Sequence, residues 1–141
     1  CERLKGYQEC LLDNGIGFDP ALVEEGLFWH SDAGYEATKR LLARTRDFTA
    51  VFAANDTFAC GVKKALEEAD LAIPRDVSLI GFDGDDIGEY LNPPLTTMRQ
   101  NREEIGTMSA EILLKKLAGE ATPERIFIPA RLVVRDSCRK V

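Results

Sequence analysis

The stretch TAVFAANDTFACGVKKAL, residues 49–66, decides the fold of this chain. Within a few residues its hydrophobic pattern changes from a continuous apolar run to a helical spacing of three and four. Its first part, Ala50–Ala54, is a short apolar run typical of a buried strand. From Phe58 onward, apolar residues recur at intervals of three and four, as they do on a helix with one buried face. Asn55 and Asp56 stand between the two patterns, where a short polar side chain can cap the first turn of a helix. The stretch therefore predicts a strand, a tight turn and a helix.

A second unit of the same kind follows directly. The segment Leu71–Asp76 contains a proline that ends the helix, and Val77–Phe82 is the apolar run of another buried strand. Asp83 comes immediately after this strand, about thirty residues after Asn55, which is the length of one strand–helix–strand crossover. Ligands of open parallel sheets bind where the strands end. We therefore expect Asn55 and Asp83 to point from neighbouring strand ends into one crevice.

The remaining elements complete an alternating order of helices and strands. The periodicity predicts helices over residues 3–12, 34–43 and 103–117, a short extended segment within 23–29, a short helix or turn over 87–92, and extended strands over 95–100, 125–128 and 130–134. Ser31 or Asp32 is expected to cap the second of these helices and Asn101 the last. Pro129 suits an edge or crossing strand. This order predicts an α/β fold built on a parallel sheet.

The composition limits the classes of function. The 141 residues carry a formal net charge of −6 and a pI near 4.9, which argues against direct contact with nucleic acid. No run reaches the roughly 18 apolar residues of a membrane span. The four cysteines, Cys1, Cys10, Cys60 and Cys138, have no paired spacing, which suggests a reducing cytoplasm. The chain opens at Cys1 without a methionine or a leader, so we expect it to be the later part of a longer protein.

Three stretches together carry a family resemblance. FAANDTFACGVKKALEEADLAIPRDVSLIGFDGDD over residues 52–86, PPLTTMRQN over 93–101 and RLVVRDSC over 131–138 resemble the effector-binding part of the lactose-repressor/galactose-repressor (LacI/GalR) family of bacterial transcription regulators. The resemblance covers nearly the whole chain. It implies a type I periplasmic-binding-protein-like fold of two Rossmann-like lobes, with a small-molecule effector in the cleft between them. It also implies a homodimer, and operator DNA bound by a helix-turn-helix upstream of this chain.

The resemblance further implies how the chain divides. Residues 1–94 would form the C-terminal effector-binding lobe, 95–120 a crossover strand and helix that belong to the other lobe, and 121–141 a return strand. Most of that other lobe would precede Cys1, so the apolar face of the 103–117 helix is expected to have no complete partner here. It would pack on a second copy of the chain or be displaced. Dimer contacts are expected from the helix carrying Cys60 and Lys64 and from Ile87–Leu91.

Four residues are the candidates for ligand binding, and each has a structural alternative. Asn55 can donate to and accept from ligand hydroxyls, or it can serve only as a helix cap. The carboxylate of Asp83 can accept from two sugar hydroxyls, or it can be a solvated loop acid. The resemblance implies that Arg3 enters the cleft with forked hydrogen bonds, although most arginines lie on the surface. Trp29 offers a flat indole for a sugar ring or a nucleobase, or it packs in a core or an interface.

The neighbouring polar residues are expected to be structural. Asp56 is interpreted as the residue that caps the helix, and Asp85 and Asp86 as solvated loop. A calcium loop that starts at Asp83 would need a glutamate at its twelfth position, where this chain has Pro94. We therefore predict no metal site.

No enzyme motif is present in the sequence. It contains no G-x-G-x-x-G, P-loop, G-x-S-x-G or H-E-x-x-H pattern, and nothing marks a nucleophile or an acid beside His30, the single histidine. We therefore predict no catalytic residues and no cofactor.

The sequence thus predicts a sensor of a sugar or of a nucleoside or purine. The alternatives are a periplasmic sugar-binding protein of a transport system, which a signal peptide upstream would support, and an enzyme, which turnover of a sugar or nucleoside would support.

Overall fold

A four-stranded sheet organises the protein. The computed structural model describes residues 2–26 and 28–140, and it places the strands in the order β1-β2-β3-β4. The strands are β1 (Ala50–Phe52), β2 (Ser78–Asp83), β3 (Thr96–Arg99) and β4 (Arg131–Val133). The first three are parallel, and β4 pairs antiparallel to β3 at the edge of the sheet. The predicted parallel sheet and the edge strand after Pro129 are confirmed.

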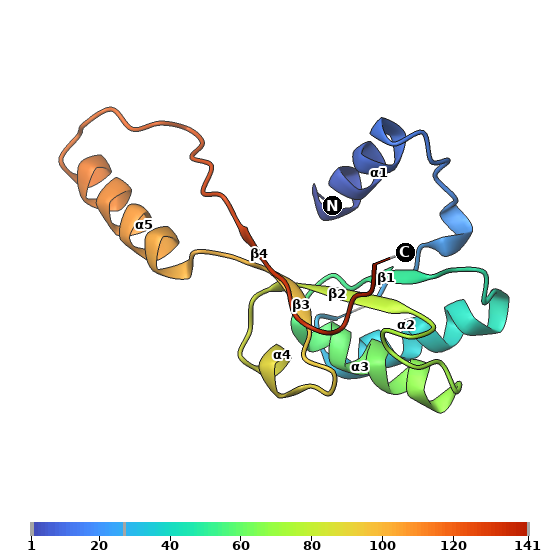
Figure 1. Ribbon diagram of the computed structural model, residues 1–141. Helices are drawn as coiled ribbons and strands as arrows, with labels where there is room; N and C mark the ends of the chain where they lie inside the picture. Colours follow the sequence, from blue (N-terminus) through green and yellow to red (C-terminus); the bar gives the residue numbers. More distant parts are fainter. Residues whose placement is uncertain (1, 27, 141) are drawn as a thin grey trace.

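The helices lie on both sides of this sheet. They are α1 (Glu2–Asp13), α2 (Ser31–Arg44), α3 (Asp56–Glu68), the single turn α4 (Ile87–Tyr90) and α5 (Arg102–Leu117), with a short 3-10 turn, η1, at Pro20–Leu22. In Figure 1, α2 and α3 lie below the sheet and α1 lies above it. None of the described helices is long and apolar enough to cross a bilayer.

The core lies between α3 and the sheet. The helix contributes Ala59, Val62 and Leu66, which follow each other at the predicted intervals of three and four. Val77 and Leu79 face them from β2 and the residue before it, and each of the five is at most 2% exposed. Burial of this apolar surface stabilises the strand–turn–helix unit from which the fold was predicted.

Two glycines let α2 and α3 approach each other backbone to backbone. A Cβ atom at Gly61 would lie 1.8 Å from the carbonyl oxygen of Ser31, and one at Gly34 would lie 2.2 Å from the carbonyl oxygen of Phe58. The start of α2 is therefore held against α3, and the loop that precedes α2 is held near Asn55 at the start of α3.

Replacement of Gly61 by alanine should disrupt this helix pair. We expect Gly61→Ala to lower the free energy of unfolding by about 2 kcal/mol, because the added methyl group forces the two backbones apart. The measurement is urea denaturation followed by circular dichroism. The control is Gly6→Ala in α1, where nothing lies within 4 Å of the added Cβ and alanine should stabilise by about 0.5–1 kcal/mol. Equal stability of the Gly61 variant and the parent would contradict this packing.

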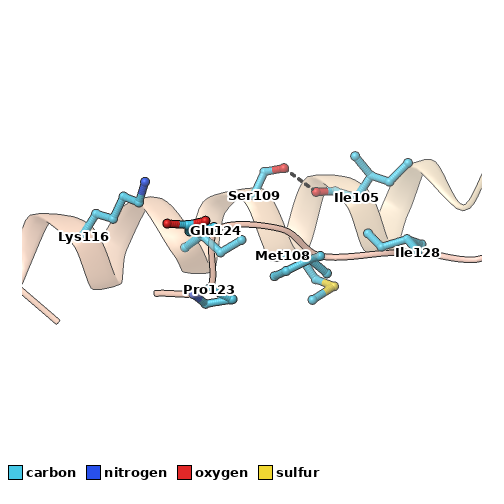
Figure 2. Close-up of a pocket in the computed structure, with 9 residues that line it drawn as sticks. Ile105, Met108, Ser109, Lys116, Pro123, Glu124 and Ile128 are labelled. Carbon is cyan, nitrogen blue, oxygen red and sulfur yellow. Dashed lines mark hydrogen bonds between the residues drawn. The ribbon is translucent and has the colours of Figure 1, made fainter. Parts of the chain in front are cut away.

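The helix α5 stands apart from the sheet. Figure 1 shows it at the end of two extended connections, and none of its residues is buried. The returning chain runs along one side of it (Figure 2). An open groove of about 420 Å³ lies there, lined by Ile126 and Ile128 of the returning chain and by Ile105, Met108 and Ile112 of the helix. On the rest of the helix Leu113, Leu114 and Leu117 are exposed. These three leucines are therefore not covered by the described residues.

Two details of secondary structure differ from the predictions. Residues 125–128 form no strand, because they run beside α5, where no neighbouring strand offers hydrogen bonds. Residues 23–26, 28 and 29 also form no strand, and the rest of that predicted extended segment, Leu27, lies outside the described residues. The extended strand predicted over 95–100 is present as β3, which pairs with β2 from Thr96 to Arg99.

The helix caps also differ. Asn55 has the extended backbone of a capping residue and its side chain accepts from the amide of Phe58, whereas Asp56 is the first helical residue. The expectation that Asp56 caps this helix is therefore wrong. Helix α2 begins at Ser31 and has His30 at the cap position without a side-chain hydrogen bond, so neither Ser31 nor Asp32 is its cap. Asn101 caps α5, as predicted.

Candidate ligand-binding site

The four predicted binding residues come together at the carboxyl ends of β1 and β2. Arg3 reaches the site from α1, Trp29 from the loop before α2, Asn55 from the turn after β1, and Asp83 is the last residue of β2. Because β1 and β2 are neighbouring parallel strands, their ends lie at the same edge of the sheet.

Direct contacts connect the four residues. Nη2 of Arg3 donates to Oδ1 of Asp83 at 3.0 Å, and the Arg3 guanidinium carbon lies 5.7 Å from the centre of the Trp29 ring. Nδ2 of Asn55 donates to the carbonyl oxygen of Trp29 at 3.4 Å. The residues that the sequence singled out therefore form one contiguous cluster, although their role toward a ligand stays a prediction.

Arg3 is held in place on several sides. Its guanidinium carbon lies 4.0 Å from the centre of the Phe82 ring, and Nη1 donates to the carbonyl oxygen of Ala54. Such stacking on an aromatic face is a favoured environment for a guanidinium. Of the five N–H groups of Arg3, the contacts with Asp83 and Ala54 engage two, which leaves others for a ligand. Phe82 was not predicted as part of the site, and its position directly before Asp83 was the available signal.

The two carboxylate oxygens of Asp83 have different surroundings. Oδ1 accepts from Nη2 of Arg3 and from Nε2 of Gln100, the latter at 2.5 Å. Oδ2 has no hydrogen-bond partner among the described residues, and the side chain is 20% exposed. The carboxylate is thus oriented through one oxygen while the other can accept from a ligand. Sequence reasoning missed Gln100, which lies at the exit of β3, beside the end of β2.

Asn55 serves as the cap of helix α3. It is only 8% exposed, and its Oδ1 accepts from the amide of Phe58 at 2.6 Å. Its oxygen is therefore engaged as the helix cap, and one of its two amide hydrogens is directed to Trp29. Toward a ligand, Asn55 can still donate its remaining N–H group.

Trp29 presents an open aromatic surface beside this polar cluster. The residue is 59% exposed, so its indole can pack against a ligand that enters from solvent. The next aromatic pair along the loop, Phe28 and His30, is stacked with ring centres 6.4 Å apart. His30 is therefore placed as an aromatic loop residue at the start of α2.

Asp56 lies beneath the site and has no exposed surface. Its Oδ1 accepts from Oγ1 of Thr97 at 2.6 Å, and its Oδ2 accepts from the amide of Asp85, also at 2.6 Å. Burial raises the pKa of the Asp56 carboxyl, and these two hydrogen bonds oppose the rise without cancelling it. A Cβ atom at Gly81 would lie 2.2 Å from Oδ1 of Asp56, so the glycine before Phe82 makes room for the carboxylate.

Asp85 is more than the solvated loop residue that we expected. Its amide is bound by Asp56, and its carboxylate forms an ion pair with Arg102 in the first turn of α5. The loop after β2 is therefore tied both to the buried Asp56 and to the helix that leaves the sheet.

The chemistry of the cluster suits binding. Across residues 2–26 and 28–140, no three histidine, cysteine, aspartate or glutamate side chains gather closely enough to hold a metal ion. Two hollows of about 420 and 500 Å³ lie elsewhere, beside α5 and beside Glu67 and Asn92. The cluster itself offers one free carboxylate oxygen, guanidinium and amide donors, and an open indole.

Comparison with known proteins shows the family of this chain. Residues 1–138 match the pattern of the periplasmic binding protein-like domain family. The chain is 37% identical over 136 residues to the HTH-type transcriptional regulator MalR of Clostridium butyricum, covering 96% of this chain and 40% of that protein.

Solved structures show the same likeness. The transcriptional regulator CelR in complex with cellobiose superposes with a TM-score of 0.92 at 36% identity, over 96% of this chain and 42% of that one. A LacI-family regulator from an Arthrobacter species in complex with lactose has a TM-score of 0.81 at 30% identity, over 96% of this chain and 50% of that one. The chain thus spans less than half the length of the curated relative that it matches.

Proposed function

We propose a function from the premise that this chain belongs to the periplasmic binding protein-like domain family. That domain is found in LacI-family transcriptional regulators, and this chain would be the effector-sensing part of such a regulator. Its effector would be a small hydroxylated molecule, a sugar in the first instance. The parent protein would bind operator DNA through a helix-turn-helix upstream of this chain.

The observation that carries the proposal is the arrangement around Asp83. One carboxylate oxygen is held by Arg3 and Gln100, and the other is free to accept from a ligand hydroxyl. Charge-assisted hydrogen bonds of this kind are roughly twice as strong as neutral ones. Arg3 and Asn55 add donors, and the exposed indole of Trp29 offers a flat apolar surface. A sugar ring has matching groups, since its hydroxyls donate and accept while its C–H faces pack on aromatics.

Two of the solved relatives suggest a sugar as the first ligand class to test. One similar regulator is solved with cellobiose and another with lactose, both of them sugars. A nucleoside or purine would use the same donors and acceptors and would stack on Trp29, so it remains the competing ligand class in the screen below.

The effector would act by changing the relation between two lobes. The four-residue cluster would form one side of the cleft, and the part of the parent protein outside this chain would supply the other. A ligand that contacts both sides binds the closed arrangement more tightly and shifts the population toward it. In a homodimer this shift would alter the spacing of the two DNA-binding heads and hence the affinity for the operator.

A cytoplasmic location fits this role. Cys10, Cys60 and Cys138 are free thiols, as is usual in a reducing compartment. The relatives reported above are transcriptional regulators, which favours regulation over the alternatives of a transport-system binding protein and an enzyme. The sequence upstream of this chain distinguishes a regulator from a transport protein, since a helix-turn-helix supports regulation and a signal peptide supports transport.

A thermal-shift screen of the full-length parent protein tests the proposal. We expect one sugar of a panel that includes cellobiose and lactose to raise the melting temperature, because a ligand at 100 times its Kd stabilises by about 2.7 kcal/mol. Nucleosides and purine bases form the second half of the panel. If only a nucleoside or purine base raises the melting temperature, the site binds that ligand class and not a sugar. If no compound of either half raises it, the proposed function is contradicted.

A further inference from the structure

The buried carboxylate of Asp56 joins two segments that each bring a residue to the site. Its Oδ2 binds the amide of Asp85, which lies two residues after Asp83. Its Oδ1 binds the hydroxyl of Thr97, which lies three residues before Gln100. Both bonds are 2.6 Å long, and Asp56 is inaccessible to solvent. A single side chain therefore contacts the strand end that carries Asp83 and the strand that carries its partner Gln100.

The turn that carries Asp83 needs such support. Asp83 has a φ of +100° and Gly84 a φ of +74°, a region of backbone conformation that costs a residue with a Cβ atom of order 1–3 kcal/mol. Such a conformation persists only where the surroundings determine it. The bond from the Asp85 amide to Asp56 fixes the end of this turn from inside, and the ion pair from Asp85 to Arg102 fixes it from outside.

The position of Gln100 depends on the other half of the same contact. Thr97 lies opposite Gly81 in the parallel pairing of β2 and β3, and Arg99 lies opposite Asp83. Gln100 follows directly and reaches Oδ1 of Asp83 through its side chain. The hydroxyl of Thr97 anchors β3 beside Gly81, where the missing Cβ admits the Asp56 carboxylate.

We propose that Asp56 is the positioning residue of the effector site: it holds the Asp83 turn and β3 together so that Gln100 takes one Asp83 oxygen and leaves the other for the effector. Asp56 touches no ligand in this arrangement and acts through Asp83. The assignment of Asp83 to an effector rests on the proposed function above, whereas the positioning of Asp83 by Asp56 does not.

The test compares Asp56→Ala with Asp56→Asn and with Ser137→Ala. Asparagine can still accept from the Asp85 amide and can donate to the Thr97 hydroxyl, so it should restore the arrangement. Ser137 is equally buried and also makes two hydrogen bonds, to the amide of Thr96 and the carbonyl of Leu79, but it contacts neither Asp83 nor Gln100. It is the control for a loss of stability alone.

The first readout needs no ligand and uses nuclear magnetic resonance of this chain. In Asp56→Ala, we expect hydrogen exchange of the Asp85 amide to accelerate at least tenfold beyond the average of the core amides. We also expect the side-chain amide signal of Gln100 to move toward its position in Asp83→Ala. Both should stay near the parent values in Asp56→Asn and Ser137→Ala. Thr97→Val keeps a similar side-chain volume and removes the hydrogen bond to Asp56. It should change both signals in the same direction, and it replaces Asp56→Ala in the test if that variant does not fold.

The second readout is the affinity of the full-length protein for cellobiose. Asp56→Ala should weaken binding about tenfold in the parent background and not at all in an Asp83→Ala background, because two residues that act as one are not additive. Unchanged signals of Asp85 and Gln100 in Asp56→Ala and in Thr97→Val would overturn the positioning role. If Asp83→Ala binds cellobiose with the affinity of the parent, the proposed effector site is wrong. The magnetic resonance result on the positioning of Asp83 would still hold.

Discussion

Asp83→Ala is expected to weaken effector binding by about 100-fold, which corresponds to about 3 kcal/mol for the loss of charge-assisted hydrogen bonds to one carboxylate. In the parent, the free oxygen of Asp83 is the acceptor that a ligand hydroxyl would meet, and the other oxygen orients Arg3. The substitution removes the acceptor and releases Arg3 and Gln100 together. The measurement is isothermal titration of the full-length variant with the sugar that stabilises the parent most.

Asp83→Asn separates the charge from the shape. Asparagine keeps the size of the side chain and tolerates positive φ better than most residues, so the turn at φ +100° should survive. It loses the charge that strengthens the bonds to Arg3 and to the ligand, and we expect a loss of affinity of about tenfold. Circular dichroism and the melting temperature without ligand show whether each variant is folded. If both variants bind the sugar with the affinity of the parent, Asp83 does not take part in effector binding.

Asp56→Ala is expected to lower the free energy of unfolding by about 3 kcal/mol. Removal of the carboxylate leaves the Thr97 hydroxyl and the Asp85 amide without their acceptor, and each unsatisfied buried donor costs about 1–3 kcal/mol. Asp56→Asn should lose less than half as much, because its amide can satisfy both groups. Urea denaturation measures the difference, and equal losses in the two variants would contradict the hydrogen-bond explanation.

The charge of Asp56 makes the free energy of unfolding depend on pH. Burial raises the pKa of its carboxyl in the folded state, so the folded chain binds this proton more tightly than the unfolded chain does. The contribution of Asp56 to stability is therefore fully present below its unfolded pKa and is lost as the pH rises through the folded pKa. Asparagine stays neutral throughout. The stability of Asp56→Asn relative to the parent should consequently improve as the pH rises from about 4 to about 8, measured by urea denaturation at each pH.

Local sequence patterns were sufficient for most of the helices and strands and for the four residues that cluster at the strand ends. The change of period within residues 49–66 located β1 and α3, and the apolar run before Asp83 located β2. The strands of parallel units end at one edge, so the sequence alone also predicted that Asn55 and Asp83 would lie close together. These inferences succeeded because hydrophobic periodicity is a local consequence of burial on one face.

The division of roles between neighbouring residues required the tertiary structure. The sequence offers Asn55 and Asp56 as nearly equivalent caps, and only the packing of α3 against β2 and β3 turns Asp56 inward to Thr97 and Asp85. Gln100 became part of the site because β3 pairs with β2, a contact between segments far apart along the chain. The predicted strand at 125–128 was wrong for a related reason, since an extended segment becomes a strand only when another strand lies beside it.

By itself, then, the sequence determined most of the helices and strands and which side chains stand at the ends of β1 and β2, because those properties depend on neighbours a few residues away. The fold decided which oxygen of Asp83 is engaged by Arg3 and Gln100, and it decided that Asn55 caps α3 while Asp56 binds Thr97 and Asp85. Those outcomes depend on distances between α1, β2 and β3, which no local pattern encodes.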